Sequence, residues 1–137
     1  MYACGFIGHR DAYGINEQIQ NEINKLLSQN YSTFYSGGMG CFDKTCEKIV
    51  KQSGGRIVYI PYSRRIIKPQ DREWYDDIYI PFKDKPYSKY DIPNRNKKLV
   101  ALCDVLLCYV YKPGGASKTM EYARRLNIPI INIATML

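Results

Sequence analysis

Glycine-rich turns that follow apolar runs are the part of this sequence best suited to chemistry. The first turn is SGGMG at residues 36–40, and the second is PGGASKT at residues 113–119. A strand that ends in glycines and opens a helix points backbone N–H groups and the positive end of the helix dipole at whatever binds there. That arrangement suits a phosphate or another anion. Together with a third glycine turn at residues 8–10, these turns predict a nucleotide-type ligand.

The residues of the three turns are therefore the candidate ligand contacts. In the second turn, backbone amides would bind the anion, hydroxyl groups would add donors and Lys118 would add charge. A simpler alternative is that the glycines only permit tight strand-to-helix connections and that Ser117 caps a helix. The candidates from the turns are Gly8, His9, Arg10, Ser36, Gly37, Gly38, Met39, Asp43, Pro113, Gly114, Gly115, Ala116, Ser117, Lys118 and Thr119.

Three polar side chains beside these turns have two interpretations each. Asp43 either caps the following helix or binds a ribose hydroxyl. His9 is either structural or a ligand contact at the end of a central strand. Arg10 pairs either with a phosphate or with a carboxylate such as Asp11. A nucleophile made of Cys41 and His9 is disfavoured, because no third group is present to orient the pair.

Composition indicates one globular domain over residues 1–137, with 45% hydrophobic and 24% charged residues. No apolar run approaches the roughly 20 residues that span a bilayer, and the first residues do not resemble a signal peptide. An odd number of cysteines, five, fits free thiols in the cytoplasm. Without a CxxC pair, and with a single histidine, the sequence predicts no metal site and no cofactor.

The net charge of +7 has two interpretations. It is either a solvated basic surface or an attraction for a polyanion or a phosphorylated small molecule. Binding of single-stranded nucleic acid needs a continuous basic groove with exposed aromatic side chains. The basic doublets at residues 64–65, 97–98 and 124–125 lie on separate elements. We therefore expect a phosphorylated small molecule as the partner, rather than a nucleic acid or a membrane.

Strand and helix patterns alternate along the chain. Apolar runs predict strands at residues 3–8, 32–35, 56–60, 105–111 and 128–133, and helical periodicity predicts helices at 16–29, 42–51, 95–103 and 118–126. Residues 61–93 form an irregular insertion rich in proline and aromatic residues. Continuous apolar strands are typical of parallel sheets covered on both faces. We therefore predict an α/β, doubly wound Rossmann-like sandwich with the strand order 3-2-1-4-5, in which the glycine turns face one crevice.

Four segments of the chain resemble motifs of the SLOG superfamily. This superfamily groups Rossmann-like proteins related to the cytokinin-activating LOG phosphoribohydrolases, called lysine decarboxylase-like, and to the DNA-processing protein DprA. The segments are CGFIGHR at residues 4–10, YSGGMGCFD at 35–43, RN followed by CDVLL within 95–107, and PGGASKTME at 113–121. The resemblance extends over nearly the whole chain except the insertion.

The resemblance adds three site residues. Arg95 and Glu121 stand where LOG enzymes carry their catalytic arginine and glutamate, and Asn96 joins the ligand contacts. Glu121 is expected in the first turn of its helix, where dipole complementarity is the alternative role. The second glycine turn departs from the LOG pattern, because Ser117 replaces a glycine and Thr119 comes one residue late.

The resemblance allows several functions. The altered turn favours a sensor or sequestering protein that binds a nucleoside monophosphate or an ADP-ribose-like molecule without turnover. The alternative is a LOG-like phosphoribohydrolase that cleaves the bond between base and ribose 5′-phosphate. DprA-like binding of single-stranded DNA is the second alternative. The resemblance also implies a homo-oligomer, for which Tyr122 and Leu126 are candidate interface residues.

Overall fold

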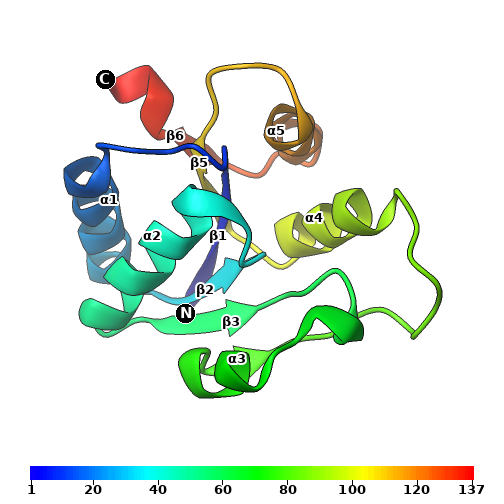
Figure 1. The fold of residues 1–137 in the computed structure, drawn as a ribbon. Coiled ribbons are helices and arrows are strands. Elements are labelled where there is room, and N and C mark those ends of the chain that lie inside the picture. Colours follow the sequence, from blue (N-terminus) through cyan, green and yellow to red (C-terminus); the bar gives the residue numbers. More distant parts are fainter.

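Six parallel strands form one sheet in the order β4-β3-β2-β1-β5-β6 (Figure 1). The computed structural model describes all of residues 1–137. The strands are β1 Tyr2–Gly8, β2 Tyr31–Ser36, β3 Arg56–Tyr59, β4 Asp77–Ile78, β5 Val105–Tyr109 and β6 Ile130–Asn132. Without β4, this order is the expected 3-2-1-4-5, so the predicted doubly wound parallel sheet is confirmed.

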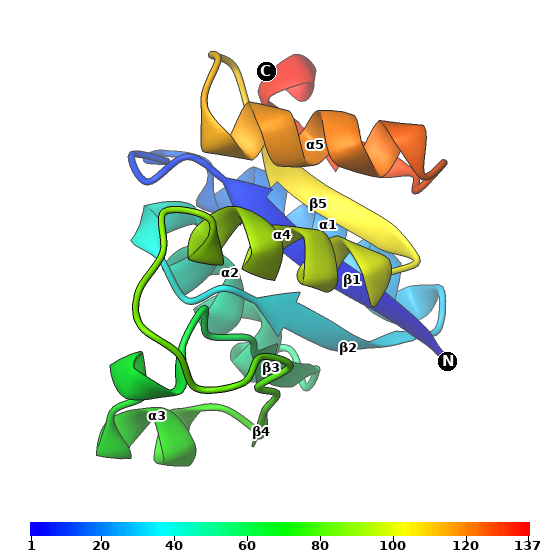
Figure 2. The same cartoon turned by 90° about the vertical axis from the view of Figure 1, so that its right-hand side faces the viewer.

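Helices cover both faces of the sheet. They are α1 Asn16–Ser28, α2 Gly40–Gln52, α3 Pro69–Trp74, α4 Asp91–Ala101 and α5 Gly115–Arg125, with short 3₁₀ helices at Arg64–Ile66 and Ile133–Met136. Figures 1 and 2 show α1 and α2 on one face and α4 and α5 on the other, with α3 beyond the β3 edge. None of these helices is long and apolar enough to cross a membrane.

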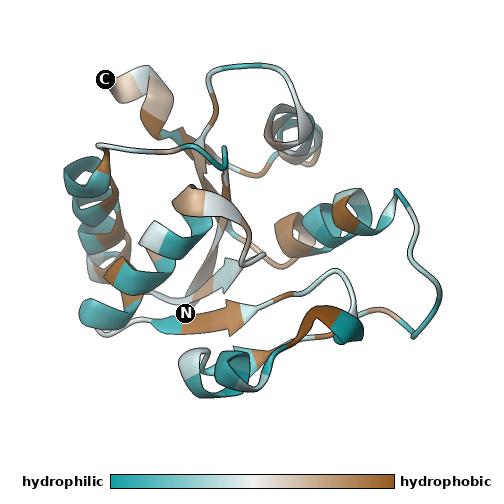
Figure 3. Ribbon diagram, in the orientation of Figure 1, coloured by the Kyte–Doolittle hydropathy of each residue, from teal (hydrophilic) through white to brown (hydrophobic).

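Apolar side chains fill the space between the sheet and each helical layer. On the α1–α2 face, the stacked rings of Phe6 and Phe34 have centroids 5.8 Å apart, and Phe42 of α2 is buried in the same cluster. On the α4–α5 face, Leu99 and Leu106 belong to a second buried cluster. Figure 3 shows apolar residues along the strands and polar residues on the outer sides of the helices. Burial on both faces explains why the strands are apolar throughout.

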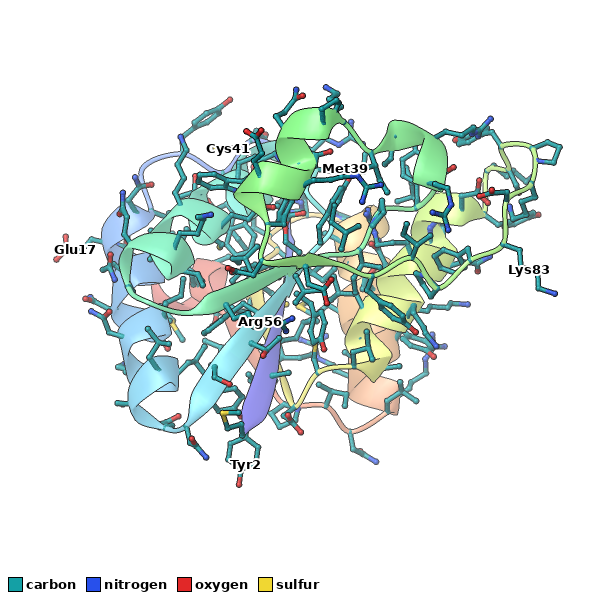
Figure 4. All side chains as sticks on the ribbon, turned by 90° about the horizontal axis from the view of Figure 1, so that it is seen from below. Tyr2, Glu17, Met39, Cys41, Arg56 and Lys83 are labelled. Carbon is teal, nitrogen blue, oxygen red and sulfur yellow. The ribbon has the colours of Figure 1, made fainter.

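The strand order reverses between β1 and β5. From β1 the chain adds β2 and β3 on one side, whereas β5 and β6 lie on the other side. Gly8 at the end of β1 pairs with Tyr109 at the end of β5. Ligands of doubly wound sheets bind outside the carboxyl ends of the strands at such a reversal. Figure 4 shows Met39 of the first glycine turn near the opposite end of the sheet from Tyr2, where β1 begins.

Several boundaries differ from the expected ones, and three differences are the largest. The insertion at residues 61–93 is not wholly irregular, because it contains a 3₁₀ helix, α3 and β4. Helix α4 begins at Asp91 rather than at Arg95. At this start, the Asp91 carboxylate accepts a hydrogen bond from the Ser88 amide at 3.0 Å. Helix α5 begins at Gly115 rather than at Lys118, so part of the second glycine turn is already helical.

All five cysteines are unpaired thiols, as expected. Cys4, Cys46, Cys103 and Cys108 are buried, and burial raises the pKa of each of these thiols. A raised pKa keeps a thiol protonated and unreactive. These four cysteines therefore act as small core residues.

Candidate functional site

A cavity of about 290 Å³ lies at the carboxyl edge of the sheet, where the strand order reverses. The cavity is lined by residues of β1 and its following loop, of the first glycine turn, of α2, of α4 and of the first turn of α5. They are Phe6, Ile7, Gly8, His9, Arg10, Gly37, Met39, Asp43, Ile92, Arg95, Asn96, Leu99, Gly115 and Ala116. The three glycine turns thus meet at one crevice.

The structure brings together most, but not all, of the candidate residues. Those that line the cavity are Gly8, His9, Arg10, Gly37, Met39, Asp43, Arg95, Asn96, Gly115 and Ala116. Those outside its lining are Ser36, Gly38, Pro113, Gly114, Ser117, Lys118, Thr119 and Glu121. The apolar wall formed by Phe6, Ile7, Ile92 and Leu99 was not among the sequence candidates. Leu99 lies four residues after Arg95 in the predicted helix, and a helix begun one turn earlier would also have placed Ile92 on this face.

Arg95 ties three elements together from the floor of the cavity. Its side chain is only 3% exposed. Its Nη1 donates hydrogen bonds to the carbonyl oxygens of Gly37 at 3.0 Å and Ile60 at 3.1 Å, and its Nη2 contacts Met39 Sδ at 3.4 Å. A Cβ on Gly37 would lie 2.7 Å from the guanidinium carbon, so glycine is required for this approach. Arg95 is therefore committed mainly to the protein backbone.

A chain of hydrogen bonds connects the two main glycine turns across the cavity wall. Arg95 Nε donates to Asn96 Oδ1 at 2.8 Å, and Asn96 Nδ2 donates to Thr119 Oγ1 at 3.2 Å. Thr119 Oγ1 in turn donates to the carbonyl oxygen of Gly115 at 3.0 Å. Because every donor points the same way, each bond polarises the next. Asn96 and Thr119 therefore hold α5 against α4 beside the cavity.

His9 fixes the loop that follows β5. Its Nε2 accepts a hydrogen bond from the Tyr111 amide at 3.0 Å, so this nitrogen carries no proton and the hydrogen lies on Nδ1. Burial, followed by the nearby Lys112 charge, lowers the pKa of His9. The imidazole is therefore neutral at pH 7. Lys112 itself pairs with Asp11 at 3.4 Å.

Asp43 is a buried carboxylate at the start of α2, only 7% exposed. Its Oδ2 accepts a hydrogen bond from the Met39 amide at 3.2 Å. Burial raises the pKa of Asp43 to about 7, opposed by the Arg95 charge and by this hydrogen bond. Every fully buried side-chain oxygen or nitrogen has a partner, so Oδ1, which makes no hydrogen bond, retains some accessible surface, and Asp43 lines the cavity.

The two helices that open from the glycine turns differ at their N-termini. At α2, the amides of Gly38, Met39 and Cys41 already donate to Ser36 Oγ, Asp43 Oδ2 and the Arg10 carbonyl oxygen.

At α5, the N-cap Gly114 supplies no side-chain cap, and the helical residues Gly115 and Ala116 line the cavity. The first amides of a helix attract anions. The N-terminus of α5 is therefore suited to bind an anion. The Asp43 carboxylate at the start of α2 is suited to accept hydrogen bonds from a ligand.

Two candidate catalytic arrangements are not assembled. Because α5 begins at Gly115, Glu121 lies in its second turn, not in the first. Glu121 is exposed, forms an ion pair with Arg124 and lies outside the cavity lining. Cys41 Sγ donates to the Ala12 carbonyl oxygen at 2.9 Å rather than pairing with His9. No group of three or more His, Cys, Asp or Glu side chains is placed to hold a metal ion.

Comparisons with known proteins identify the fold. No protein-family model matches the chain, and no curated protein matches it. Among solved structures, DNA processing protein A (DprA) from Streptococcus pneumoniae superposes with a TM-score of 0.74 at 18% identity over 95% of this chain. The molybdenum cofactor binding protein from Rippkaea orientalis superposes with a TM-score of 0.69 at 16% identity over 96% of this chain. The chain therefore has the same Rossmann-like fold as these proteins.

The chain spans only part of the length of the DprA proteins. It spans 49% of the Streptococcus pneumoniae protein. It also spans 63% of DprA from Helicobacter pylori, whose structure describes a single-stranded DNA binding mode and which superposes with a TM-score of 0.71 at 18% identity. It spans 75% of the Rippkaea orientalis protein. At these identities the structural likeness establishes only the fold. The nature of the ligand has to be inferred from the residues of the cavity.

Proposed function

We propose that the cavity binds a nucleotide or a nucleotide-derived ligand, such as a nucleoside monophosphate or an ADP-ribose-like molecule. The observation that carries this proposal is that the cavity lining combines two kinds of polar group. It includes the α5 N-terminus, which has no side-chain cap, and Asp43, whose Oδ1 makes no hydrogen bond. Phosphate at α5 and ribose hydroxyls at Asp43 would match these two features. Arg10, exposed at the rim, adds positive charge on the path of an incoming anion.

We favour a sensor or sequestering role over hydrolysis. The LOG-like alternative needs Glu121 near the anomeric carbon and Arg95 free to hold the phosphate or the leaving group. Glu121 pairs with Arg124 outside the cavity, and Arg95 donates its hydrogen bonds to backbone carbonyl oxygens and Asn96. Retention of ligand without release of the base is the expected result.

Five unpaired cysteines are consistent with a cytoplasmic protein.

Replacement of Ala116 with Asp tests the anion end of the cavity. Ala116 lies in the first turn of α5, so the new carboxylate is compatible with the helix dipole but occupies and repels the anion position. We expect AMP and inorganic phosphate to stabilise the wild type in thermal shift and to bind Ala116→Asp at least about 10-fold more weakly. Isothermal calorimetry measures the loss.

The matched control is Asn16→Asp. Asn16 is an exposed first-turn residue of α1, which also has no side-chain cap, and it lies outside the cavity. This variant changes net charge by the same amount and should keep wild-type affinity. Equal binding by Ala116→Asp and the wild type would contradict the placement of the anion. No binding of either probe to the wild type would contradict the proposed function itself.

Single-stranded DNA binding is the second candidate, because the DprA neighbours do not support the expected exclusion of nucleic acids. Tyr90 and Tyr111 are 60% and 55% exposed, and they lie next to α4 and β5 at the carboxyl edge. Lys89 and Lys112 lie over their rings at 5.2 and 5.4 Å. Exposed rings beside cations are able to stack bases and attract phosphates.

If this second function operates, Tyr90→Ala and Tyr111→Ala should each weaken binding of oligo-dT by about 1–3 kcal/mol. Tyr2→Ala is the control, because Tyr2 is comparably exposed, at 50%, but lies at the start of β1, away from the carboxyl edge. Fluorescence anisotropy across a salt series measures affinity and its salt dependence. Absence of binding at low salt would eliminate this candidate.

A homo-oligomer remains part of the proposal. Leu126 is 44% exposed, whereas Tyr122 is half-buried beneath the Lys97 ammonium group at 5.5 Å. Leu126 is therefore the stronger interface candidate of the two.

A further inference from the structure

Glu47 is a fully buried carboxylate that the proposed function does not use. It lies on α2 with none of its surface exposed. Burial of a carboxylate costs several kcal/mol unless hydrogen bonds and charges compensate it. A leucine in this position would be simpler for a core that only needed to fill space. The contacts of Glu47 indicate what it does instead.

Donors from three elements converge on Glu47. Its Oε2 accepts hydrogen bonds from Ser36 Oγ at 2.6 Å and Tyr75 Oη at 2.8 Å. Its Oε1 accepts from Trp74 Nε1 at 3.1 Å and lies 3.7 Å from Lys44 Nζ. Both carboxylate oxygens are therefore satisfied, and the carboxylate joins the end of β2 to the end of α3.

Ser36 connects Glu47 to the first glycine turn through hydrogen bonds. Its hydroxyl group has one proton, which it donates to Glu47, so its lone pairs are available to the Gly38 amide at 3.0 Å. Gly38 has a φ of +66°, and a Cβ there would lie 2.9 Å from Tyr75 Oη. Glu47 thus fixes the Ser36 hydroxyl group, and Tyr75 packs directly behind the turn.

Helix α3 contacts the same carboxylate through its last residue. None of the residues of α3 is buried. The following Tyr75 is buried and stacks on Tyr59 with ring centroids 4.6 Å apart. Its last residue, Trp74, is the only tryptophan in the chain, and Lys51 of α2 lies over the indole ring at 4.4 Å. Trp74 and the following Tyr75 are therefore the points at which this segment is held to α2.

We propose that Glu47 is a positioning residue that holds the first glycine turn through Ser36 and couples it to Trp74 of α3. The inference rests on the proposed function, because Gly37 and Met39 of this turn line the ligand cavity. A bound ligand that orders or shifts the turn changes the geometry of the Ser36–Glu47 hydrogen bond. Because Trp74 Nε1 donates to the same carboxylate, the environment of the Trp74 indole changes as well. By reciprocity, displacement of α3 alters ligand affinity.

Tryptophan fluorescence tests the coupling directly, because Trp74 is the only emitter of its kind. We expect saturation with AMP to change Trp74 emission in the wild type. In Ser36→Ala, calorimetry should still detect AMP binding, weakened about 5-fold by the loss of one hydrogen bond, but Trp74 emission should no longer respond. The matched control is Ser32→Ala, also on β2, whose hydroxyl group contacts Met1 Sδ and not Glu47. Its emission should respond as in the wild type.

A double-mutant cycle tests whether Glu47 acts through Ser36. We expect Glu47→Gln to weaken AMP binding about as much as Ser36→Ala, and the double variant to lose little more. Additive losses of affinity, or an intact Trp74 response in Ser36→Ala, would overturn the proposal. Circular dichroism first establishes that each variant is folded.

Hydrogen exchange of the Gly38 amide separates this inference from the proposed function. If neither AMP nor phosphate binds the wild type, the proposed function fails while the positioning role remains testable. We then expect the Gly38 amide to exchange faster in Ser36→Ala and Glu47→Gln than in the wild type and Ser32→Ala. Unchanged exchange in Glu47→Gln would overturn the positioning role.

Discussion

Replacing Arg95 with Ala is expected to destabilise the protein by about 3–5 kcal/mol. The guanidinium group is 3% exposed and donates to the carbonyl oxygens of Gly37 and Ile60 and to the Asn96 side chain. Each buried acceptor left without a donor costs about 1–3 kcal/mol. A domain of this size is stable by only about 5–15 kcal/mol, so the loss is a large part of the total. Urea denaturation measures it.

Two further variants define what the Arg95 result means. Arg125→Ala removes the same charge from an exposed position in the last turn of α5 and should change stability by less than about 1 kcal/mol. Arg95→Lys should lie between Arg95→Ala and the wild type, because one ammonium group cannot reproduce the planar fork of donors. If Arg95→Ala were as stable as the wild type but bound no ligand, Arg95 would be a ligand-binding residue and not a tie between elements.

This expectation differs from the role that sequence motifs imply for Arg95. The resemblance to LOG enzymes predicts a catalytic, ligand-contacting arginine, whereas the hydrogen bonds of Arg95 in this structure go to the backbone and to Asn96. A sequence identifies which residue types lie near a site. Whether a guanidinium group turns toward ligand or toward backbone depends on which carbonyl oxygens lack partners, and only the packed structure determines that. Gly37 illustrates the point, because its missing side chain makes room for Arg95 as well as for a ligand.

The strand order was predictable because two independent patterns agreed. Apolar runs gave the strands, and the requirement that all glycine turns face one crevice gave the order 3-2-1-4-5. The two-residue strand β4 was not predictable, since Asp77 and Ile78 carry no strand pattern and pair only because the edge of β3 is available.

The start of α4 was hidden by Pro93. A proline is usually a helix breaker, but here it occupies the first turn, where no helical partner for its missing amide is needed.

The burial of two acidic residues of α2 is consistent with their spacing in the sequence. Asp43, Cys46, Glu47 and Val50 recur at helical spacing and form one buried face. A reading of hydropathy alone places only Cys46 and Val50 in the core, because acidic residues on a helix usually face solvent. The donors that make burial possible, Trp74 and Tyr75, lie in the insertion, and no local pattern connects them to α2.

Replacing Asp43 with Asn is expected to increase stability above pH 7 and to remove a pH dependence. Burial raises the pKa of Asp43 to about 7 in the folded protein, whereas an unfolded aspartate titrates near about 3.9. Between these values the folded state keeps a proton that the unfolded state has released. Stability therefore falls as pH rises from about 4 to about 7, by up to about 4 kcal/mol, and the loss is complete above pH 7.

Asparagine has no such titration, and its side-chain oxygen is still able to accept the hydrogen bond from the Met39 amide. The free energy of unfolding of Asp43→Asn minus that of the wild type should accordingly grow as pH rises from about 4 to about 8. Denaturation in urea at each pH measures this difference. Glu17→Gln, an exposed change in the first turn of α1, is the control and should show no comparable trend. If the difference for Asp43→Asn stayed constant with pH, Asp43 would be charged throughout, and its carboxylate would be compensated by Arg95 and the α2 N-terminus.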